Sequence, residues 1–323
     1  MSNSRASGLP NWYIRTYGGL VVAVFCLIAL GGATRIMKAG LACPDWPLCF
    51  GDVIPNYHPQ VYFEFIHRVV AGSVAIVTVV LQILLWRSRA PRALKWLAGF
   101  SVALLLAQII FGGLTVLLLL KAGVVATHLI LGTGFFVTLL WIYLSLKEPE
   151  PAAPRAIGPR WLFWSCLSIV AFVYGQILLG GLVASNFASL VCIDWPTCHG
   201  QWFPTFSGII GLHIIHRLGG YFVFTAVWVN LAIVHKFASS QRLKYLSRLM
   251  AGAVCVQVVL GVANILLLTP PLIAVLHLAT GVLLLSLTMR QLHVVRALAT
   301  VSQARRAQSS PRVSGLQPRS TPT

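Results

Sequence analysis

The sequence is poor in acidic residues. Six Asp and Glu residues stand against 24 Lys and Arg, and charged residues make up only 9% of the 323-residue chain. Because soluble domains carry about 25% charged residues, an ordinary water-soluble globule is excluded. A net charge of +18 does not indicate nucleic acid here, since the basic residues interrupt long apolar runs instead of gathering on a polar face. No nucleic acid is therefore expected as a partner.

Cysteine is also scarce, and long polar stretches are nearly absent. Seven cysteines in 323 residues exclude a small domain built on disulfides, and a hydrophobic content of 58% excludes a disordered chain. The apolar runs are continuous, whereas the strands of a membrane β-barrel alternate over about ten residues. What is present therefore predicts an all-α polytopic membrane protein, with the lipid bilayer as its surroundings.

Eight apolar stretches are long enough to cross a bilayer, which takes about 20 residues in a helix. They cover residues 15–34, 61–86, 93–120, 122–146, 161–184, 208–234, 244–268 and 271–294. We expect eight transmembrane helices.

The distribution of Lys and Arg predicts the orientation. If the chain crosses the membrane eight times, 19 of its 24 Lys and Arg residues fall on the side of the termini. The other side receives Arg35, Lys38 and Lys121, while Arg68 and Arg217 lie near helix starts. Cytoplasmic loops carry the excess of positive charge, so both termini should be cytoplasmic and the cysteine-containing loops outside. No small-residue cleavage site follows the first apolar run, so an uncleaved first helix in the cytoplasmic (inner) membrane is expected.

The two halves of the chain repeat at a constant offset of 149 residues. Residues preserved by this shift include the Gly31-Gly32 and Gly180-Gly181 pairs, Cys43 and Cys192, Asp45 and Asp194, Trp46 and Trp195, Cys49 and Cys198, Gln108 and Gln257, and Gly132 and Gly281. Each half holds four spans, an even number, so both halves have the same orientation. The repeat predicts two pseudo-symmetric, parallel four-helix bundles.

The repeat also sets the expected domain boundaries. Residues 1–14 form a cytoplasmic N-terminus and 15–146 the N-terminal bundle. A cytoplasmic linker at 147–160 leads to the C-terminal bundle at 161–297. Residues 298–323, rich in Ser, Arg, Gln and Pro, are expected to be a disordered basic tail.

Four histidines occupy matched positions in the predicted spans. His67 and His128 in the first half correspond to His216 and His277 in the second, and all four lie roughly 10 Å below the outer face at 1.5 Å per residue. Two imidazoles at one level of a bundle can ligate one iron from opposite sides of a flat macrocycle, which predicts two haem sites. The alternative is that each is a lone buried polar residue. Zinc and copper are weaker alternatives, because a zinc site would need Cys or carboxylate partners at the same level and a copper site would usually recruit Met.

Charged residues next to these histidines are candidates for further roles. Arg68 and Arg217 follow two of the ligands directly, so we expect them to bind haem propionates; the alternative is that they extend to lipid phosphates. Glu64 is the one acid inside a predicted span, and its counterpart in the second half is His213. This difference suggests that one haem is chemically altered and the other transfers electrons, with Glu64 moving protons or stabilising positive charge. The alternative is a salt bridge from Glu64 to Arg68 or Arg35.

The outside loops each carry two cysteines. Because the outer side is oxidising, we expect disulfides Cys43–Cys49 and Cys192–Cys198, which would fix each loop over the outer haem edges. A redox role for these cysteines is the alternative. His58 and His199, also in the outside loops, are left without a role.

These motifs together resemble the haem A synthase family. The resemblance rests on EFIHR at 64–68, CPDWPLC at 43–49, CIDWPTC at 192–198 and the four histidines, and it spans nearly the whole chain. It implies an oxidoreductase that converts the methyl group of haem O to the formyl group of haem A for terminal oxidase assembly.

The resemblance also implies roles for the matched residues. His216 and His277 would hold haem b as cofactor, His67 and His128 would frame haem O as substrate, and Glu64 would be the catalytic or cation-stabilising carboxylate. Implied partners are haem O synthase (protohaem farnesyltransferase) and an electron donor, and a homo-oligomer is left open.

Two other functions are considered. A di-haem b electron carrier of the cytochrome b561 type would use the same four histidines, although the difference between Glu64 and His213 and the cysteine loops argue against it. A haem exporter or chaperone would suit pockets near the outer face, but the sequence has no nucleotide-binding loop to energise export.

Overall fold

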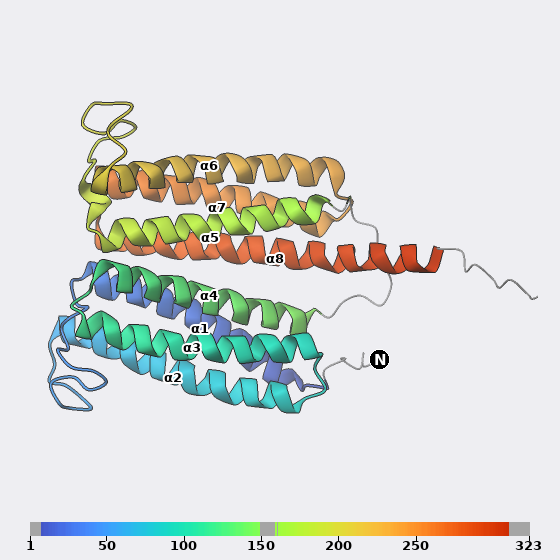
Figure 1. Ribbon diagram of the computed structural model, residues 1–323, viewed down its shortest axis with the longest axis horizontal. Coiled ribbons are helices and arrows are strands. Elements are labelled where there is room, and N and C mark those ends of the chain that lie inside the picture. Colours follow the sequence, from blue (N-terminus) through green and yellow to red (C-terminus); the bar gives the residue numbers. More distant parts are fainter. Residues whose placement is uncertain (1–7, 149–158, 160, 310–323) are drawn as a thin grey trace, which may run out of the picture.

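Eight long α-helices lying side by side make up the protein in the computed structural model (Figure 1). The structure describes residues 8–148, 159 and 161–309, with the backbone alone for 297–309. The helices are α1 (Asn11–Ile36), α2 (Pro59–Arg87), α3 (Arg92–Leu117), α4 (Ala122–Lys147), α5 (Trp161–Ser185), α6 (Gly208–Phe237), α7 (Gln241–Leu266) and α8 (Pro271–Ser309), with a short 3₁₀ helix, η1, at Ala188–Leu190. No strand occurs in these ranges beyond two isolated bridges. The prediction of an all-α fold is confirmed.

Each of the eight helices contains a segment long and apolar enough to span a bilayer, with a mean hydropathy between 1.5 and 2.4. A helix satisfies its own backbone hydrogen bonds, which lipid cannot do, so continuous apolar runs of this length become helices. The chain is a multi-pass membrane protein.

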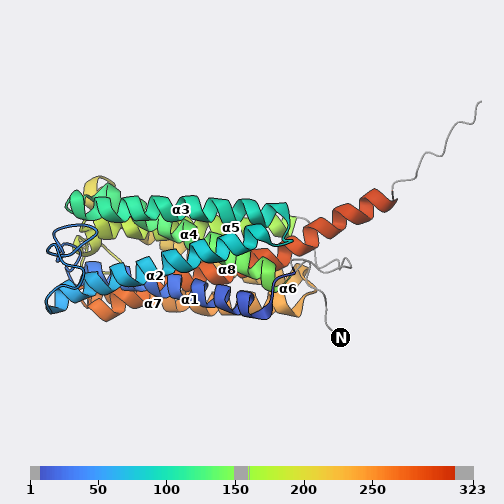
Figure 2. The same ribbon diagram turned by 90° about the horizontal axis from the view of Figure 1, so that it is seen from below.

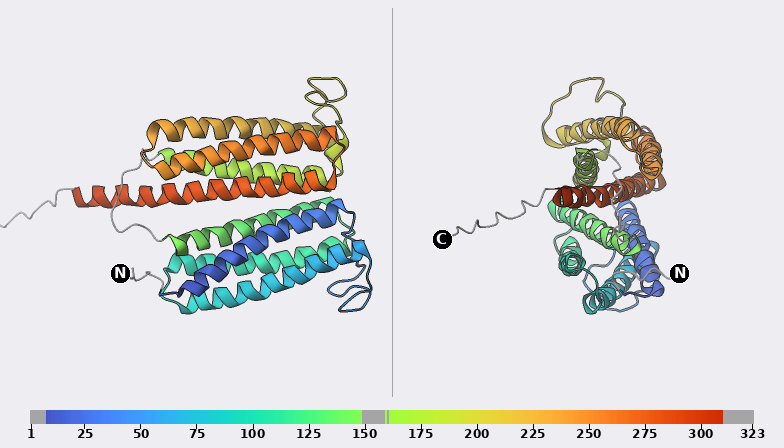
Figure 3. Two further views of the ribbon diagram at one scale, coloured as in Figure 1. Left: turned by 180° about the vertical axis from the view of Figure 1, so that it is seen from behind. Right: turned by 90° about the vertical axis from the view of Figure 1, so that its right-hand side faces the viewer.

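The helices form two groups, α1–α4 and α5–α8, which lie one above the other in Figure 1. Within the first group α1 packs against α2 and α4, and α3 packs against the same two helices; the second group repeats this pattern. The groups meet where α1 contacts α8, α4 contacts α5, and α4 contacts α8 (Figure 3). Exchanging the two groups leaves this pattern unchanged, which supports the pseudo-symmetric interpretation.

Small residues allow the two groups to approach closely. A Cβ added at Gly32 of α1 would lie 2.5 Å from Cδ2 of Leu278 in α8, and one added at Gly181 of α5 would lie 2.4 Å from Cδ2 of Leu129 in α4. Glycines of this kind let membrane helices pack tightly. The two contacts are equivalent in the repeat, and each leucine follows a predicted haem ligand directly.

The long connections at residues 37–58 and 186–207 lie at one end of the helices, which we call the disulfide end (Figures 1 and 2). The start of α1 and the end of α8 lie at the other end, the terminal end. The largest fully buried side chains, such as Tyr13, Leu85, Ile142, Leu243 and Leu284, lie in the middle or towards the terminal end. The tightly filled core is therefore displaced from the disulfide end.

The ends of the chain differ from the sequence prediction at two places. Helix α1 starts at Asn11, inside the segment assigned to the N-terminus, and α8 continues to Ser309, although a disordered tail was expected from residue 298. Residues 298–309 are rich in Ala, Gln and Arg, which favour helix, and the first proline after them is Pro311. Residues 310–323 and most of the predicted linker lie outside the described residues.

Candidate functional site

The four repeated histidines all lie near the disulfide end. His67 and His216 each lie eight residues after the first residue of their helices, α2 and α6. His128 and His277 each lie six residues after the first residue of α4 and α8. The imidazoles of His67 and His128 are close enough to interact electrostatically, as are those of His216 and His277. The structure therefore brings together the same two pairs that the repeat predicts.

A glycine from a neighbouring helix clears space beside every one of these histidines. A Cβ at Gly31 would lie 3.0 Å from Cε1 of His67, and one at Gly180 would lie 3.0 Å from Cε1 of His216. The equivalent positions beside the other two ligands are glycine as well: a Cβ would lie 3.3 Å from His128 at Gly112 and 3.0 Å from His277 at Gly261. Each imidazole is thus held against bare backbone, and any larger residue would displace it.

The donor set fits a haem better than a bare metal ion. Within the described part of the chain no three His, Cys, Asp or Glu side chains gather in one place to hold an ion. Two neighbouring imidazoles at the same end of an apolar bundle are instead suited to the two axial positions of a haem iron. Buried Nδ1 of His67 has no hydrogen-bond partner among the described residues, so its ring is not committed to a structural contact.

Glu64 is buried in the same half, on α2, with 4% of its surface exposed. Its Oε1 accepts a hydrogen bond of 2.6 Å from Nη2 of Arg68, and its Oε2 accepts one of 2.9 Å from the backbone N–H of Cys43. The salt bridge considered from the sequence is therefore present, with Arg68 as the partner. Charge-assisted hydrogen bonds of this kind stabilise the ionised form and orient its oxygens.

Arg35, the other partner considered for Glu64, has a different role. Its guanidinium donates to the backbone carbonyl of Ala184, which is its own counterpart in the repeat, and lies 5.4 Å from the ring centre of Phe187. Arg35 therefore connects the two halves at the disulfide end.

Arg68 also holds the loop above it. Its Nη1 donates to the carbonyl oxygens of Asp45 at 2.8 Å and Leu48 at 2.6 Å. Binding of a haem propionate by Arg68 stays a prediction, and the structure adds that the guanidinium already contacts the disulfide loop.

Arg217 has the same function in the second half. Its Nη1 donates to the carbonyl of Thr197 at 2.8 Å and its Nη2 to that of Cys192 at 2.6 Å. Its Nε donates to Nε2 of His213 at 3.2 Å, so the residue that replaces Glu64 still contacts the arginine one turn later. Sequence reasoning missed these loop contacts, because backbone acceptors leave no trace in residue identity.

The two disulfides predicted from the sequence, Cys43–Cys49 and Cys192–Cys198, are both formed. Each encloses an aspartate that stabilises the turn. Hydrogen bonds from the backbone N–H groups of Gly51 and Phe50 hold the pKa of the Asp45 carboxyl below its ordinary value.

The second loop has an additional donor. Hydrogen bonds from the Thr197 hydroxyl at 2.6 Å and from the backbone N–H groups of Gly200 and His199 hold the pKa of Asp194 well below its ordinary value. His199 therefore contributes to the site through its backbone N–H. For the His58 side chain no role emerges.

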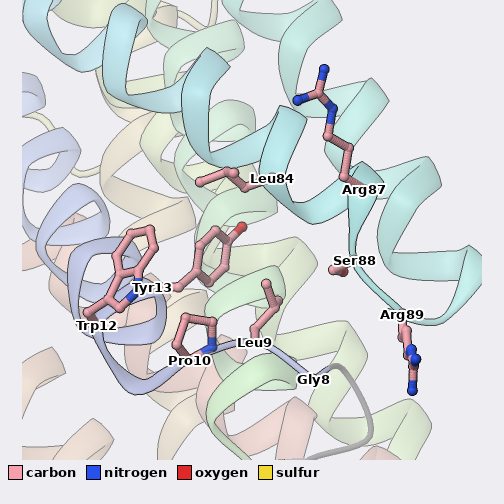
Figure 4. A pocket seen from close by; sticks show the side chains of 9 residues that line it. All are labelled: Gly8, Leu9, Pro10, Trp12, Tyr13, Leu84, Arg87, Ser88 and Arg89. Atoms are coloured by element: carbon pink, nitrogen blue, oxygen red, sulfur yellow. The ribbon is translucent and has the colours of Figure 1, made fainter.

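A separate hollow lies far from the histidines. A groove of about 420 Å³ at the terminal end is lined by residues at the start of α1 and the end of α2, among them Trp12, Tyr13 and Arg87 (Figure 4). None of the repeated histidines lines it. It is not part of the candidate site.

Fold and site together define a polytopic membrane protein with a pair of intramembrane histidines in each half. Comparison with known proteins identifies the family to which it belongs. Residues 15–61 and 56–289 match the model of the COX15-CtaA family, described as cytochrome oxidase assembly protein. The chain belongs to this family.

Individual relatives carry a more specific name. The chain is 32% identical over 315 residues to a protein of Shewanella oneidensis named heme A synthase. This alignment covers 85% of this chain and 93% of the relative. It is 27% identical over 270 residues to a heme A synthase of Halalkalibacterium halodurans, covering 82% of this chain and 91% of the relative.

Proposed function

We propose that this protein is a haem A synthase, which oxidises a methyl group of haem O to the formyl group of haem A for terminal oxidase assembly. The relatives of the family carry this name. The observation that supports it most is that both halves contain a histidine pair, whereas among the described residues a buried carboxylate, Glu64, occurs beside only one of them.

The two pairs have different roles in this proposal. His67 and His128 hold the substrate haem O in the N-terminal half, and His216 and His277 hold haem b in the C-terminal half. The bound haem b supplies one-electron transfer between the substrate site and an external electron donor or acceptor. The glycines beside the four histidines leave room for the Cε1 side of each imidazole to approach the neighbouring helix.

Glu64 acts on protons and charge at the substrate site. Conversion of a methyl to a formyl group is a four-electron oxidation that replaces two hydrogens by one oxygen from dioxygen or water. Protons must therefore leave the reacting carbon, and the electrons pass to dioxygen or to the external acceptor. Glu64 lies three residues before His67, on the same face of α2, and its oxygens are oriented by Arg68 and the backbone N–H of Cys43. A carboxylate held in this way can accept a proton or stabilise a developing positive charge.

The remaining assignments concern orientation and partners. We place the disulfide end outside and the termini in the cytoplasm of a cytoplasmic-membrane protein, in accord with the distribution of Lys and Arg. Haem O synthase is the expected source of the substrate, whose hydrophobic tail is suited to arrival through the bilayer.

The test is to express the chain with a haem O synthase in cells that make no haem A, and to identify the extracted haems by mass. We expect haem A, and none in cells with the haem O synthase alone. If folded protein is present in the membrane and only haem B and haem O are recovered, the proposal is wrong.

The alternative of a di-haem b electron carrier predicts haem b in both halves of the purified protein and no requirement for Glu64. The same extraction distinguishes the two functions. The unequal surroundings of the histidine pairs argue against the carrier, because electron transfer alone needs no buried carboxylate beside one ligand.

A further inference from the structure

The two halves differ in what holds one of the equivalent histidines. In α5, the Nε2 atom of Gln176 lies 3.0 Å from Nδ1 of His216 and donates to the His216 carbonyl oxygen at 2.7 Å. The position that matches Gln176 in the first half is Leu27, and Nδ1 of His67 has no hydrogen-bond partner in the described part of the chain. One ligand is therefore fixed by a side chain and its counterpart is not.

Two further differences between the halves, both on α6, provide the space for the Gln176 side chain. A Cβ at Gly219 would lie 2.3 Å from Oε1 of Gln176, and one at Gly220 would lie 3.5 Å from its Nε2. The matching residues in the first half are Val70 and Ala71. A glutamine at position 27 would therefore meet the Val70 side chain, so the glutamine and the two glycines occur together in the half where all three are needed.

The second histidine of each pair has similar surroundings, with one further contact in the second half, where Nε2 of the Gln257 side chain lies 3.4 Å from Nε2 of His277. The backbone carbonyl of Gln108 lies near the His128 ring, and that of Gln257 lies near the His277 ring. Side chains of the same two glutamines contact equivalent glycines of α4 and α8. The difference between the halves is thus largest at His67 and His216, and the additional contact at His277 also belongs to the C-terminal half.

The chemistry of a ligating imidazole explains why this contact matters. A histidine that binds iron through one ring nitrogen donates the N–H of the other, and the acceptor sets the orientation and basicity of the ring. The oxygen and nitrogen of a glutamine carboxamide exchange places by a half-turn about its last bond. After that turn, which gives up the bond to the His216 carbonyl and needs a small shift of the carboxamide away from that oxygen, Oε1 of Gln176 can accept the hydrogen bond from Nδ1–H of a haem-bound His216.

We infer that Gln176 is a positioning residue that makes the C-terminal half retain its haem, whereas Leu27 leaves His67 without this support so that the N-terminal half releases its haem readily. The inference rests on the proposed function, in which one haem is a permanent cofactor and the other must leave as product. Because the reaction product has to depart in every cycle, weaker support of His67 favours turnover by allowing faster release of the haem from the N-terminal half.

The test measures haem release from the full-length protein, purified in detergent with its bound haems and mixed with excess apomyoglobin as haem acceptor. The haem type transferred is identified by mass, so haem b reports on the C-terminal half and haem O or haem A on the N-terminal half. We expect haem b to leave the wild-type protein more slowly than haem O or haem A does. Loss of a second partner of a metal-bound histidine weakens metal binding roughly 10- to 100-fold, so Gln176→Leu should accelerate haem b release by about that factor.

Two further variants make the test specific. Gln82→Leu removes another buried glutamine, one that donates to the Tyr17 hydroxyl at 2.8 Å in the first half, and should leave both release rates unchanged. The combined variant Leu27→Gln, Val70→Gly and Ala71→Gly transfers the support to the first half, and should slow the release of haem O or haem A.

A spectroscopic measurement gives a second readout that packing damage alone would not produce. Loss of the hydrogen bond makes His216 a weaker electron donor, so the reduction potential of haem b in Gln176→Leu should rise while its low-spin spectrum is kept. If haem b leaves this variant at the wild-type rate with an unchanged potential, the inference is wrong and the haem sites stand. If the purified wild-type protein binds no haem with two axial histidines, the proposed function and the inference are both wrong.

Discussion

The two halves of this protein are alike in what would touch the iron and different in what lies just behind it. Both contain a histidine pair, a glycine beside each histidine, an arginine that holds a disulfide loop, and an aspartate inside that loop. They differ in that the N-terminal half places Glu64 where the C-terminal half has His213, and Leu27 where the other has Gln176.

Under the proposed function, this comparison explains how one architecture can hold two haems for different purposes. Conserving the ligands and their glycines preserves the binding geometry, because a shift of the imidazole would be needed to accommodate any added side chain. Changing the residues next to the histidines alters the local charge, the capacity for proton transfer and the strength of haem binding without moving the ligands. The following predictions test this division, beginning with the largest expected effect.

Substituting Glu64 should have the greatest consequence. Glu64→Gln removes the charge and keeps the size, and a lost acid or base costs roughly 10²- to 10⁴-fold in rate. We expect haem A formation to fall by that factor while haem b stays bound, measured by haem extraction and by the absorption spectrum of the purified protein. The matched variant His213→Gln should retain most of the activity. Haem A formation at the wild-type rate in Glu64→Gln would show that the carboxylate is only structural.

Removing the two arginines should affect stability unequally. Arg68→Leu leaves the carboxylate of Glu64, which is 4% exposed, without its cation, and breaking a buried ion pair in this way costs about 3–5 kcal/mol. Arg217→Leu removes the partner of a histidine, His213, and leaves no buried carboxylate without its cation, so its cost should be smaller. Thermal unfolding of both variants in detergent measures the difference; equal losses would mean that the ion pair adds nothing beyond the loop contacts.

The two disulfides should contribute equally to stability and unequally to activity. Each closes a loop with a sequence separation of 6, for which the loop-entropy relation gives about 2 kcal/mol. Replacing Cys43 and Cys49 by serine also disturbs the backbone N–H that binds Glu64, a charged hydrogen bond of about 1.5–3 kcal/mol, so haem A formation should fall roughly tenfold.

The matched control is replacement of Cys192 and Cys198 by serine, which should lower stability by a similar amount with little effect on the rate. If both pairs of substitutions lower the rate equally, the loops act only as structural elements.

The smallest effect should be a difference in acid sensitivity between the loops. The pKa values of Asp45 and Asp194 are lowered in the folded protein, so their contribution is present above the ordinary Asp value of about 3.9 and is lost as pH falls through the folded value. Asp194 accepts one more hydrogen bond, from Thr197, and should stay ionised to a lower pH.

Hydrogen exchange of the loop amides checks this order. On acidification below about pH 3.9, Phe50 and Gly51 should lose protection before His199 and Gly200. Thr197→Val should remove the difference, and loops that open at the same pH in the wild-type protein would contradict it.

Much of the fold could be predicted from the sequence. The helices were found because hydropathy is local, and the constant offset of 149 residues identified equivalent histidines and cysteines without any structure. The end of α8 was less predictable: its composition from residue 298 is polar, and only the helix propensity of Ala, Gln and Arg carries it on to Ser309.

The candidate site was predicted as a set of residues, and the contacts between them were not. Glu64 and Arg68 are four residues apart on one helix, so their salt bridge could be considered in advance. Gln176 was missed, although the mismatch with Leu27 in an otherwise regular repeat was a visible signal. Polar residues that interrupt an apolar repeat in one half only are the positions to examine.

The sequence alone determined the membrane-spanning helices, the matched histidine pairs and the disulfide loops, because these depend on local hydropathy, helical period and spacing along the chain. Only the tertiary structure decided which backbone carbonyls the arginines bind, where Arg35 crosses between the halves, and which imidazole Gln176 supports. Those contacts join helices and loops far apart in the chain, and their partners are often backbone atoms, which every residue has. The scarcity of acids made Glu64 visible, and the fold showed what binds it.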